Sequence, residues 1–278
     1  MEKTILILSI ITLFFAGCTK DDVFHEGDVF VYGVPDIVPN EPELPEEPGE
    51  SLANETITVN GVSFTMIAVE GGTFKMGAQS SDSGGDNYYS EAWDNESPVH
   101  DVTLSSYYIG ETEVTQELWK AVKGSNPSYF SGYPQRPVEQ VSWNDCQTFI
   151  KKLNQLTGKD FRLPTEAEWE YAPRGGNKSK GYKYSGSNTM DNVAWYWENS
   201  SSTTHDVKIK QANELGIYDM SGNVWEWCQD WYSSSYYSSS PSTNPTGPSS
   251  GSHRVLSPLL PSYHATFPIV LLPLYLYP

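Results

Sequence analysis

The sequence predicts strand-forming segments first and helix-forming segments after them, an order that is typical of the α+β class. The first observation is an alternation of apolar and polar residues on both sides of Asn60-Gly61. The second is a helical spacing of apolar residues between Ser142 and Gly158. From residue 191 to residue 231, aromatic residues alternate with polar turns without a clear period, which predicts irregular structure there.

Strands are expected from about Thr56 to Ile109. Asn60-Gly61 is a strong two-residue hairpin signal, because both residues tolerate positive φ. Gly71-Gly72 predicts a second turn before another strand, and residues 99–109 are again rich in β-forming residues. The apolar residues that alternate around the first turn are Ile57, Val59, Val62, Phe64 and Met66.

Two helices are predicted next, each between a capping residue and a glycine. Thr115 begins a short helix that ends at Gly124. Ser142 begins a longer helix that ends at Gly158, with apolar residues at helical spacing. Cys146 lies in that apolar stripe, which favours a small buried thiol over a reactive one.

A third helix is predicted to begin at a capping box formed by Thr165 and Glu168. Pro173 falls where this helix should still be turning. A proline there removes an N–H and clashes with the carbonyl of Trp169, at a cost of about 3 kcal/mol in a helix interior. Either the helix ends at Ala172 or this copy of the domain is damaged.

Residues 257–278 differ in composition from everything before them. They contain no charged side chain, but five prolines and six leucines. That many prolines disfavour a membrane-spanning helix. We therefore expect an aberrant tail that is out of register with the rest of the protein, as a frameshift would produce. The domain at 56–256 is then expected to be truncated at its C-terminus.

Residues 1–18 have the pattern of a signal peptide, with Lys3, an apolar run and small residues before Cys18. This pattern resembles a bacterial lipoprotein signal, which implies that Cys18 is lipidated. The protein would then be anchored in the cell envelope, on the periplasmic or surface face of the outer membrane. A plain secretory signal with an incidental cysteine is the alternative. Residues 19–55 hold five prolines among acids, so we expect an extended tether.

Charge and cysteine content restrict the partners. The formal net charge of −18 comes mostly from residues 19–55, so the remaining domain is only mildly acidic. Nucleic-acid binding requires a basic face, and the charge distribution argues against such a partner. Cys146 and Cys228 can form one disulfide in an oxidising compartment, but the sequence alone leaves this open.

Short motifs rich in glycine, tryptophan and acidic residues follow one another through the domain. They are Gly71–Gly77, Pro98–His100, Thr112–Gln116, Arg136–Trp143, Arg162–Tyr171, Gly222–Trp227 and His253–Val255. Each is weak alone, but the ordered set resembles the formylglycine-generating enzyme family, also called sulfatase-modifying factors. The resemblance implies a variant of the C-type-lectin-like fold, a compact α+β domain with little regular structure.

Enzymes of this family are oxidoreductases that convert a cysteine of a sulfatase to formylglycine, using oxygen and copper held by two cysteines. In the family these cysteines follow a Gly-Gly-Ser motif placed directly after an Arg-Val pair, which is Arg254-Val255 here. Residues 256–258 read Leu-Ser-Pro instead, and Cys146 and Cys228 belong to other motifs. The thiolates that select Cu(I) are therefore missing, and enzymatic activity is uncertain.

One turn offers oxygen ligands for a hard cation. Asp219 and Glu226 supply carboxylates, and Gly222 and Val224 supply carbonyls. These positions match the second calcium site of the family, so the resemblance implies a structural calcium ion. A turn whose acids face water is the alternative.

The resemblance assigns three further residues. Asn192 and the carbonyl of Val193 would contribute to a first calcium site, although residues 204–207, which would complete it, depart from the enzymes. Trp225 matches an aromatic that lines the substrate groove, with core packing as the alternative.

The sequence thus predicts an exported lipoprotein whose sulfatase-modifying-factor-like domain is non-catalytic in this copy and forms a calcium-stabilised binding scaffold. One alternative is an active formylglycine-generating oxidase with a sulfatase-like polypeptide as its partner. The other is a lectin-like module that presents the Tyr/Trp/Ser-rich surface around Trp195–Tyr237 to a glycan or a partner protein.

Overall fold

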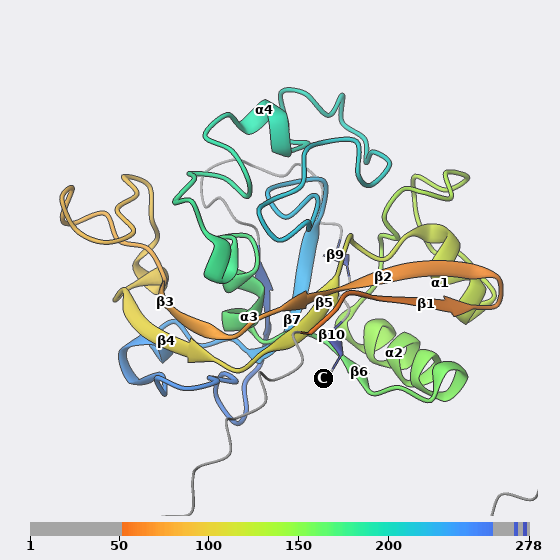
Figure 1. Ribbon diagram of the computed structural model, residues 1–278, viewed down its shortest axis with the longest axis horizontal. Helices are drawn as coiled ribbons and strands as arrows, with labels where there is room; N and C mark the ends of the chain where they lie inside the picture. Colours follow the sequence, from red (N-terminus) through yellow and green to blue (C-terminus); the bar gives the residue numbers. More distant parts are fainter. Residues whose placement is uncertain (1–51, 258–269, 272–274, 277–278) are drawn as a thin grey trace, which may run out of the picture. The chain divides into compact units, whose positions relative to one another are not determined.

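The computed structural model describes residues 52–257 and two short stretches, 270–271 and 275–276. Cys18, the signal segment, most of the tether and most of the tail lie outside the described residues. The chain divides into a unit of residues 1–49 and a unit of residues 50–278. All described residues belong to the second unit, and they form the α+β, loop-rich domain predicted from the sequence (Figure 1).

Strands dominate the first half, and helices lie between them and the last strands. The strands are β1 (Glu55–Val59), β2 (Val62–Val69), β3 (Gly72–Met76), β4 (His100–Leu104), β5 (Tyr107–Gly110), β6 (Phe161–Arg162), β7 (Trp225–Trp231), β8 (Arg254–Ser257), β9 (Val270–Leu271) and β10 (Tyr275–Leu276). The α-helices are α1 (Gln116–Lys123), α2 (Trp143–Thr157), α3 (Glu166–Tyr171) and α4 (Met190–Val193). Short 3-10 turns are η1 (Asp94–Glu96), η2 (Gly176–Lys178) and η3 (Tyr236–Ser239).

The strands form three sheets. The order in the largest is β1-β2-β5-β10-β6, the second pairs β3 with β4, and the third has the order β8-β7-β9. All pairs are antiparallel except β7 with β9. The short strands β9 and β10 lie beyond residue 257, so backbone from the tail segment takes part in two of the sheets.

The first hairpin follows its sequence signal. Asn60 and Gly61 have φ values of 49° and 85°, and Val59 pairs with Val62 across the turn. The Asn60 side chain donates a hydrogen bond of 2.8 Å to the carbonyl of Ala121. The turn residue thus also attaches the hairpin to α1.

The helix ends likewise agree with the sequence. The side chains of Thr115, Ser142 and Thr165 each cap a helix by accepting a backbone N–H three residues later. Gly124 and Gly158 close α1 and α2 in the left-handed conformation, which a residue without a Cβ adopts at little cost.

Pro173 does not interrupt a helix. The last residue of α3 is Tyr171, and the Ala172 N–H still bonds the Glu168 carbonyl at 3.2 Å as the cap. Of the two alternatives for Pro173, the helix that ends at Ala172 is the one observed.

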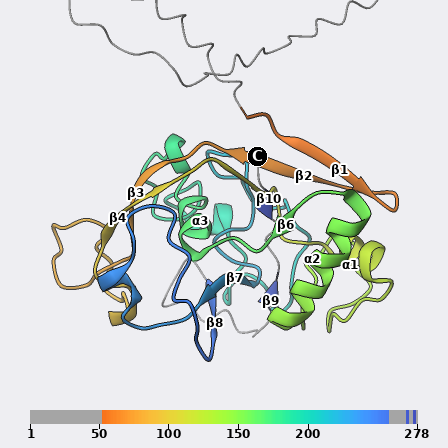
Figure 2. The ribbon, with the colours of Figure 1, turned by 90° about the horizontal axis from the view of Figure 1, so that it is seen from below.

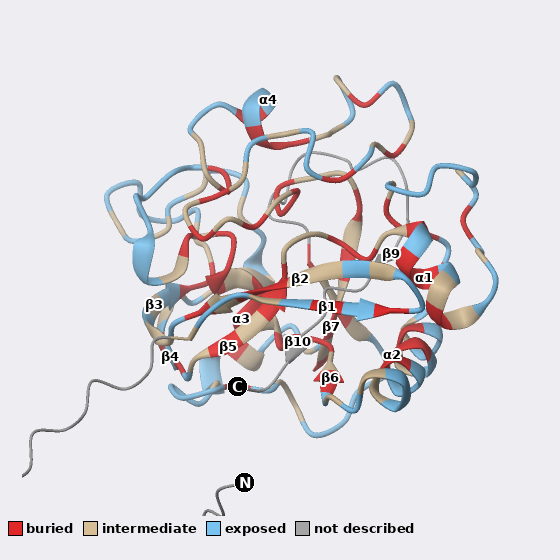
Figure 3. Ribbon diagram, turned by 45° about the vertical axis from the view of Figure 1, so that its right-hand side comes forward, coloured by how far each residue is buried: buried red, intermediate tan, exposed pale blue. Residues whose placement is uncertain are grey.

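Two main hydrophobic cores support the sheets. Residues of β1, β2, α1 and α2 form one core, and residues of β3, β4, β5, α3, β7 and β8 form the other. Figure 2 shows the same division, with α1 and α2 beside the β1–β2 hairpin and α3 beside β3 and β4. In the loop segment around α4, exposed residues alternate with intermediate and buried ones (Figure 3), and the segment has a small core of its own.

The two cysteines of the described domain are not joined. Cys146 lies on α2 in the first core, and Cys228 lies on β7 in the second. Both are free thiols with no exposed surface. The possible disulfide is therefore not formed.

Candidate functional site

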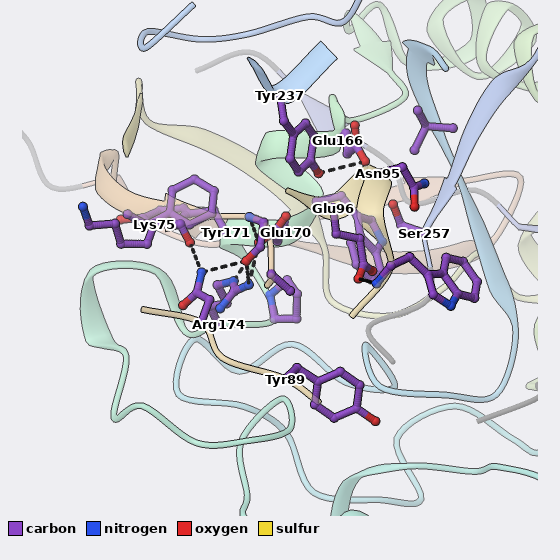
Figure 4. Close-up of a pocket in the computed structure, with 18 of the residues that line it drawn as sticks. Lys75, Tyr89, Asn95, Glu96, Glu166, Glu170, Tyr171, Arg174, Tyr237 and Ser257 are labelled. Carbon is purple, nitrogen blue, oxygen red and sulfur yellow. Dashed lines mark hydrogen bonds and ion pairs between the residues drawn. The ribbon is translucent and has the colours of Figure 1, made fainter. Parts of the chain in front are cut away.

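A cavity of about 860 Å³ opens beside α3, between β3, the start of β7, β8 and three loops (Figure 4). Aromatic side chains surround it. Tyr88, Trp93, Tyr182 and Tyr232 line the cavity although each is 39–50% exposed, so aromatic rings are accessible to solvent at its mouth. Large pockets with aromatic walls and a few polar groups are the usual form of ligand sites.

Three glutamates give this cavity an acidic wall. Glu166 is the first residue of α3, and Glu170 lies one turn later on the same helix face. Glu96 ends the short turn η1 and reaches the same cavity from a distant part of the sequence. Figure 4 shows these carboxylates around one space, with Tyr237 beside Glu166.

Each of these carboxylates has a local hydrogen-bond partner. Tyr237 donates its hydroxyl to Oε1 of Glu166 at 3.1 Å. The backbone N–H of Trp93 donates to Oε2 of Glu96 at 2.8 Å. Oε1 of Glu170 accepts from the Gly77 N–H at 2.9 Å and from the Arg174 guanidinium at 2.6 Å.

Desolvation controls the protonation of the wall. Desolvation, the largest cause, and the charges of the neighbouring acids Asp230, Glu170 and Glu96 together raise the pKa of Glu166 to about 8, against the opposing hydrogen bond from Tyr237. Desolvation also raises the pKa of Glu96. Asp230 lies behind Glu166 and accepts its backbone N–H at 3.0 Å, and burial raises the pKa of Asp230 to about 7.

The predicted calcium turn lies elsewhere, in the interior. Asp219 and Glu226 are each only 3% exposed, so these acids do not face water. Burial raises the pKa of Asp219 to about 6 and that of Glu226 to about 7. A third buried acid, Glu113, faces both of them, and its pKa is raised well above the ordinary value by desolvation and by their charges.

The donor atoms of this turn partly fit a cation. Oδ1 of Asp219 and Oε1 of Glu113 are buried without a hydrogen-bond partner, which suits an oxygen-seeking ion. The Gly222 carbonyl accepts the Val224 N–H at 2.8 Å, and the Glu226 carboxylate accepts the Trp169 indole N–H. No three acidic, histidine or cysteine side chains in the described ranges are grouped closely enough to hold a metal by themselves. Backbone carbonyls would have to complete the shell.

The first predicted calcium site has less support. Asn192 is exposed on α4, and its side-chain amide reaches Ser187 at a long 3.5 Å. Val193 is buried in the small core around Tyr184 and Met190. The two side chains therefore differ in exposure, and the first calcium site stays a prediction.

Trp225 lines the cavity, and its assignment to a substrate groove stays a prediction. Trp195 does not line it. Its ring is stacked at 3.7 Å on His205 and carries the Lys210 ammonium at 4.0 Å from its centroid. Of the predicted Trp195–Tyr237 surface, the part that reaches the cavity comes from β7, the loop that follows it and η3.

The sequence reading missed the acidic wall. Glu166 and Glu170 lie in the Arg162–Tyr171 motif, but the sequence indicated only the capping box formed by Thr165 and Glu168. Glu96 and Trp93 come from a loop with no distinctive pattern. Their convergence with α3 depends on long-range packing, which no local sequence feature reports.

Comparison with known proteins gives consistent matches. Residues 55–257 match the family described as "Sulfatase-modifying factor enzyme 1-like domain". The chain is 39% identical over 222 residues to a protein of Paenibacillus barcinonensis named "Chaperone protein LppX", covering 62% of this chain and 73% of that protein. It is 32% identical over 253 residues to the formylglycine-generating enzyme of Streptomyces coelicolor, covering 68% and 76% of the two chains.

Two solved structures have a similar fold. Treponema denticola variable protein 1 superposes with a TM-score of 0.69 at 34% identity, covering 82% of this chain and 100% of that one. PvdO from Pseudomonas aeruginosa superposes with a TM-score of 0.60 at 22% identity and covers 81% of this chain and 100% of its own, which shows the shared fold.

Proposed function

Because the chain belongs to the sulfatase-modifying factor enzyme 1-like family, we propose that its domain is a non-catalytic binding member of that family, with the aromatic cavity as its binding site. We take the scaffold to be the C-type-lectin-like variant of the α+β fold. The observation that carries the proposal is the state of the two thiols in the described domain.

Neither thiol is available as a copper ligand. Cys146 and Cys228 are fully buried in separate cores, and desolvation raises the pKa of both thiols well above the ordinary value. A thiol must lose its proton to bind a metal, and burial in apolar surroundings opposes that loss. The family reaction needs a pair of sulfur ligands in one site, and these two residues do not provide it.

A direct assay tests the non-catalytic role. The purified full chain is incubated with a Cys-X-Pro-X-Arg peptide, Cu(I) and oxygen, beside a known formylglycine-generating enzyme as positive control. We expect the peptide cysteine to stay intact in the sample with this chain, as measured by peptide mass and by hydrazide capture of aldehydes. Turnover to the aldehyde would refute the proposal and establish the alternative, an active oxidase.

The cavity supports a binding role. Ring faces at its mouth and glutamates on its wall can hold a peptide side chain or a sugar. A relative with 39% identity bears the name of a chaperone protein, and a chaperone binds other polypeptides. A polypeptide ligand is therefore the first choice and a glycan the second.

Two exposed tryptophans offer a matched test of this site. Trp93 lines the cavity and Trp197 does not, yet each is 50% exposed. Peptide and glycan arrays are probed with the wild-type chain and with the two alanine variants. Trp93→Ala should weaken binding at least tenfold and Trp197→Ala should not. Equal loss in both variants, or loss only with Trp197→Ala, would exclude the cavity.

We also propose that calcium stabilises the scaffold at the 219–226 turn. The carboxylates of Asp219 and Glu226 and the carbonyls of Gly222 and Val224 would hold the ion, and Glu113 would add a fifth donor. The unpartnered oxygens of Asp219 and Glu113 support this assignment. When bound, the ion would offset the mutual repulsion of these buried acids.

Export and anchoring remain part of the proposal. Cys18 would carry the lipid, residues 19–55 would act as the tether, and the domain would stand at the cell envelope. No helix among the described residues is both long and apolar enough to cross a bilayer. Metabolic labelling with an alkynyl fatty acid should mark the wild-type chain and not Cys18→Ser. Labelling that persists in Cys18→Ser, or none in the wild type, would contradict lipidation.

A further inference from the structure

We infer that the cavity binds a primary alkylammonium group, such as a lysine side chain of a polypeptide or a free aliphatic amine. This inference rests on the proposed function, because it takes the cavity to be the binding site. It names the chemistry of the ligand from the charge, the free acceptor atoms and the rings that line the cavity.

Charge complementarity is the first argument. Glu170 is paired with Arg174 at 2.6 Å, but neither Glu96 nor Glu166 has a cation within ion-pair distance in the described part of the chain. Lys75, at the edge of the cavity, is engaged by Asp101 at 3.0 Å. Two carboxyl groups that face one hollow without an ion pair of their own, with only the longer-range charge of Arg174 acting on Glu96, favour a cationic ligand there.

The free acceptor atoms distinguish between kinds of cation. In each of the three glutamates, one oxygen is already used: by Trp93 at Glu96, by Tyr237 at Glu166 and by Gly77 and Arg174 at Glu170. For the described residues, the other oxygen of each carboxylate accepts no hydrogen bond. A guanidinium group prefers both oxygens of one carboxylate, whereas an ammonium group has three separate donors. One open oxygen per glutamate therefore suits an ammonium group better.

The size and lining of the cavity argue for an organic cation instead of a bare ion. The space of about 860 Å³ is far larger than a metal ion requires. The rings of Trp93 and Tyr232 at the mouth can cover the methylene stem of the ligand and attract its charge through their faces.

The protonation of Glu166 links binding to pH. Its carboxyl faces Glu170 on its own helix, Asp230 on β7, Tyr237 on η3 and Glu96 on η1. Because these surroundings raise its pKa to about 8, the carboxyl of the free protein is largely protonated at pH 7. Binding of a cation favours the ionised form and releases a proton, so affinity should increase from pH 6 to pH 8.

The test compares ligands that differ in the charged group alone. The full chain is titrated calorimetrically at pH 8 with Nα-acetyl-lysine amide, Nα-acetyl-arginine amide and Nα-acetyl-norleucine amide, and with cadaverine as a free amine. We expect the lysine derivative to bind at least tenfold more tightly than the arginine derivative, and the norleucine derivative not to bind. Comparison of the lysine derivative with cadaverine distinguishes a polypeptide source of the ammonium group from a free amine.

Variants locate the binding. Glu166→Gln and Glu96→Gln should each weaken ammonium binding about tenfold or more, because each removes one charged hydrogen bond. Glu198→Gln, an exposed acid outside the cavity, is the control and should bind like wild type. Equal melting temperatures of the variants and the wild-type chain show that the loss is not caused by unfolding.

The outcomes separate this inference from the proposed function. No binding of either amine, equal affinity for the arginine derivative, or undiminished binding in Glu166→Gln and Glu96→Gln would overturn it. A neutral ligand that binds the wild-type chain but not Trp93→Ala would overturn the ammonium assignment and leave the binding role intact. Aldehyde formation in the peptide assay would instead overturn the proposed function itself.

Discussion

The domain holds two groups of carboxylates away from bulk water, and their surroundings differ. Glu113, Asp219 and Glu226 are enclosed by the protein, and each is only 3% exposed. Glu96, Glu166 and Glu170 lie on the wall of an open cavity with aromatic rings at its mouth. The enclosed group can be neutralised only by protons or by a small ion inside the structure. The open group can also be neutralised by a molecule that enters from solvent.

The largest expected effect concerns the turn that carries the enclosed group. A Cβ added at Gly222 would lie 2.3 Å from the carbonyl oxygen of Trp195, so backbone must move. Gly222→Ala should lower the free energy of unfolding by about 3 kcal/mol, measured by chemical denaturation. Gly84→Ala is the control, because its nearest neighbour would be 3.6 Å away and its surroundings are exposed. Similar stability of the two variants would show that the turn tolerates displacement.

The next effect separates the two groups by their response to calcium. Saturating calcium should raise the free energy of unfolding by about 2.7 kcal/mol at a hundredfold excess over Kd. Asp219→Asn should abolish most of this increment, because it removes a charged ligand atom, whereas Glu166→Gln should retain it. The measurement is thermal unfolding with calcium or with a chelator. An increment that survives Asp219→Asn would exclude the assigned site.

A smaller effect is the pH dependence of the free energy of unfolding that Glu166 confers. Its folded pKa of about 8 exceeds the unfolded value of about 4.5, so the folded state binds more protons between these values. Its contribution to stability is fully present below pH 4.5 and is lost as pH rises towards 8. Between pH 6.5 and pH 8, wild type should lose on the order of 1 to 2 kcal/mol relative to Glu166→Gln. Parallel stability curves for the two proteins would contradict the shifted pKa.

The smallest effect is expected at the cavity mouth. Trp93→Ala and Trp197→Ala should each change the free energy of unfolding by less than about 0.5 kcal/mol, because both rings are half exposed. Only Trp93→Ala should weaken ligand binding. A large loss of stability in Trp93→Ala would mean that this ring supports the fold, and would contradict its assignment as a binding residue at the cavity mouth.

Local chemistry made much of the fold predictable. Asn60-Gly61, Thr115, Ser142 and Thr165 mark a turn and three helix starts through their own backbone preferences or short-range hydrogen bonds, and each lies where the sequence predicted it. The ordered region was expected from Thr56, and β1 begins at Glu55.

The cavity wall could not be predicted in the same way. Glu96 and Glu166 are separated by seventy residues, and they meet because the residues directly after β3 bond both η1, at the carbonyl of Glu96, and α3, at the carboxylate of Glu170. The burial of Asp219 and Glu226 was also not evident, since a turn rich in acids usually faces solvent. Trp225 was assigned to a groove by its family motif alone; it lines the cavity, and its role in binding stays a prediction.

The position of Cys228 has a practical consequence. Its sulfur lies 3.5 Å from the hydroxyl of Ser257 on β8, under the edge of the sheet that borders the cavity. Because both thiols are fully buried, a thiol-modifying reagent reaches Cys228 when the core that contains β7 and β8 opens, and reaches Cys146 when the core that contains α2 opens. The rates at which the two sulfurs are alkylated therefore report how often each of the two hydrophobic cores opens in the native domain.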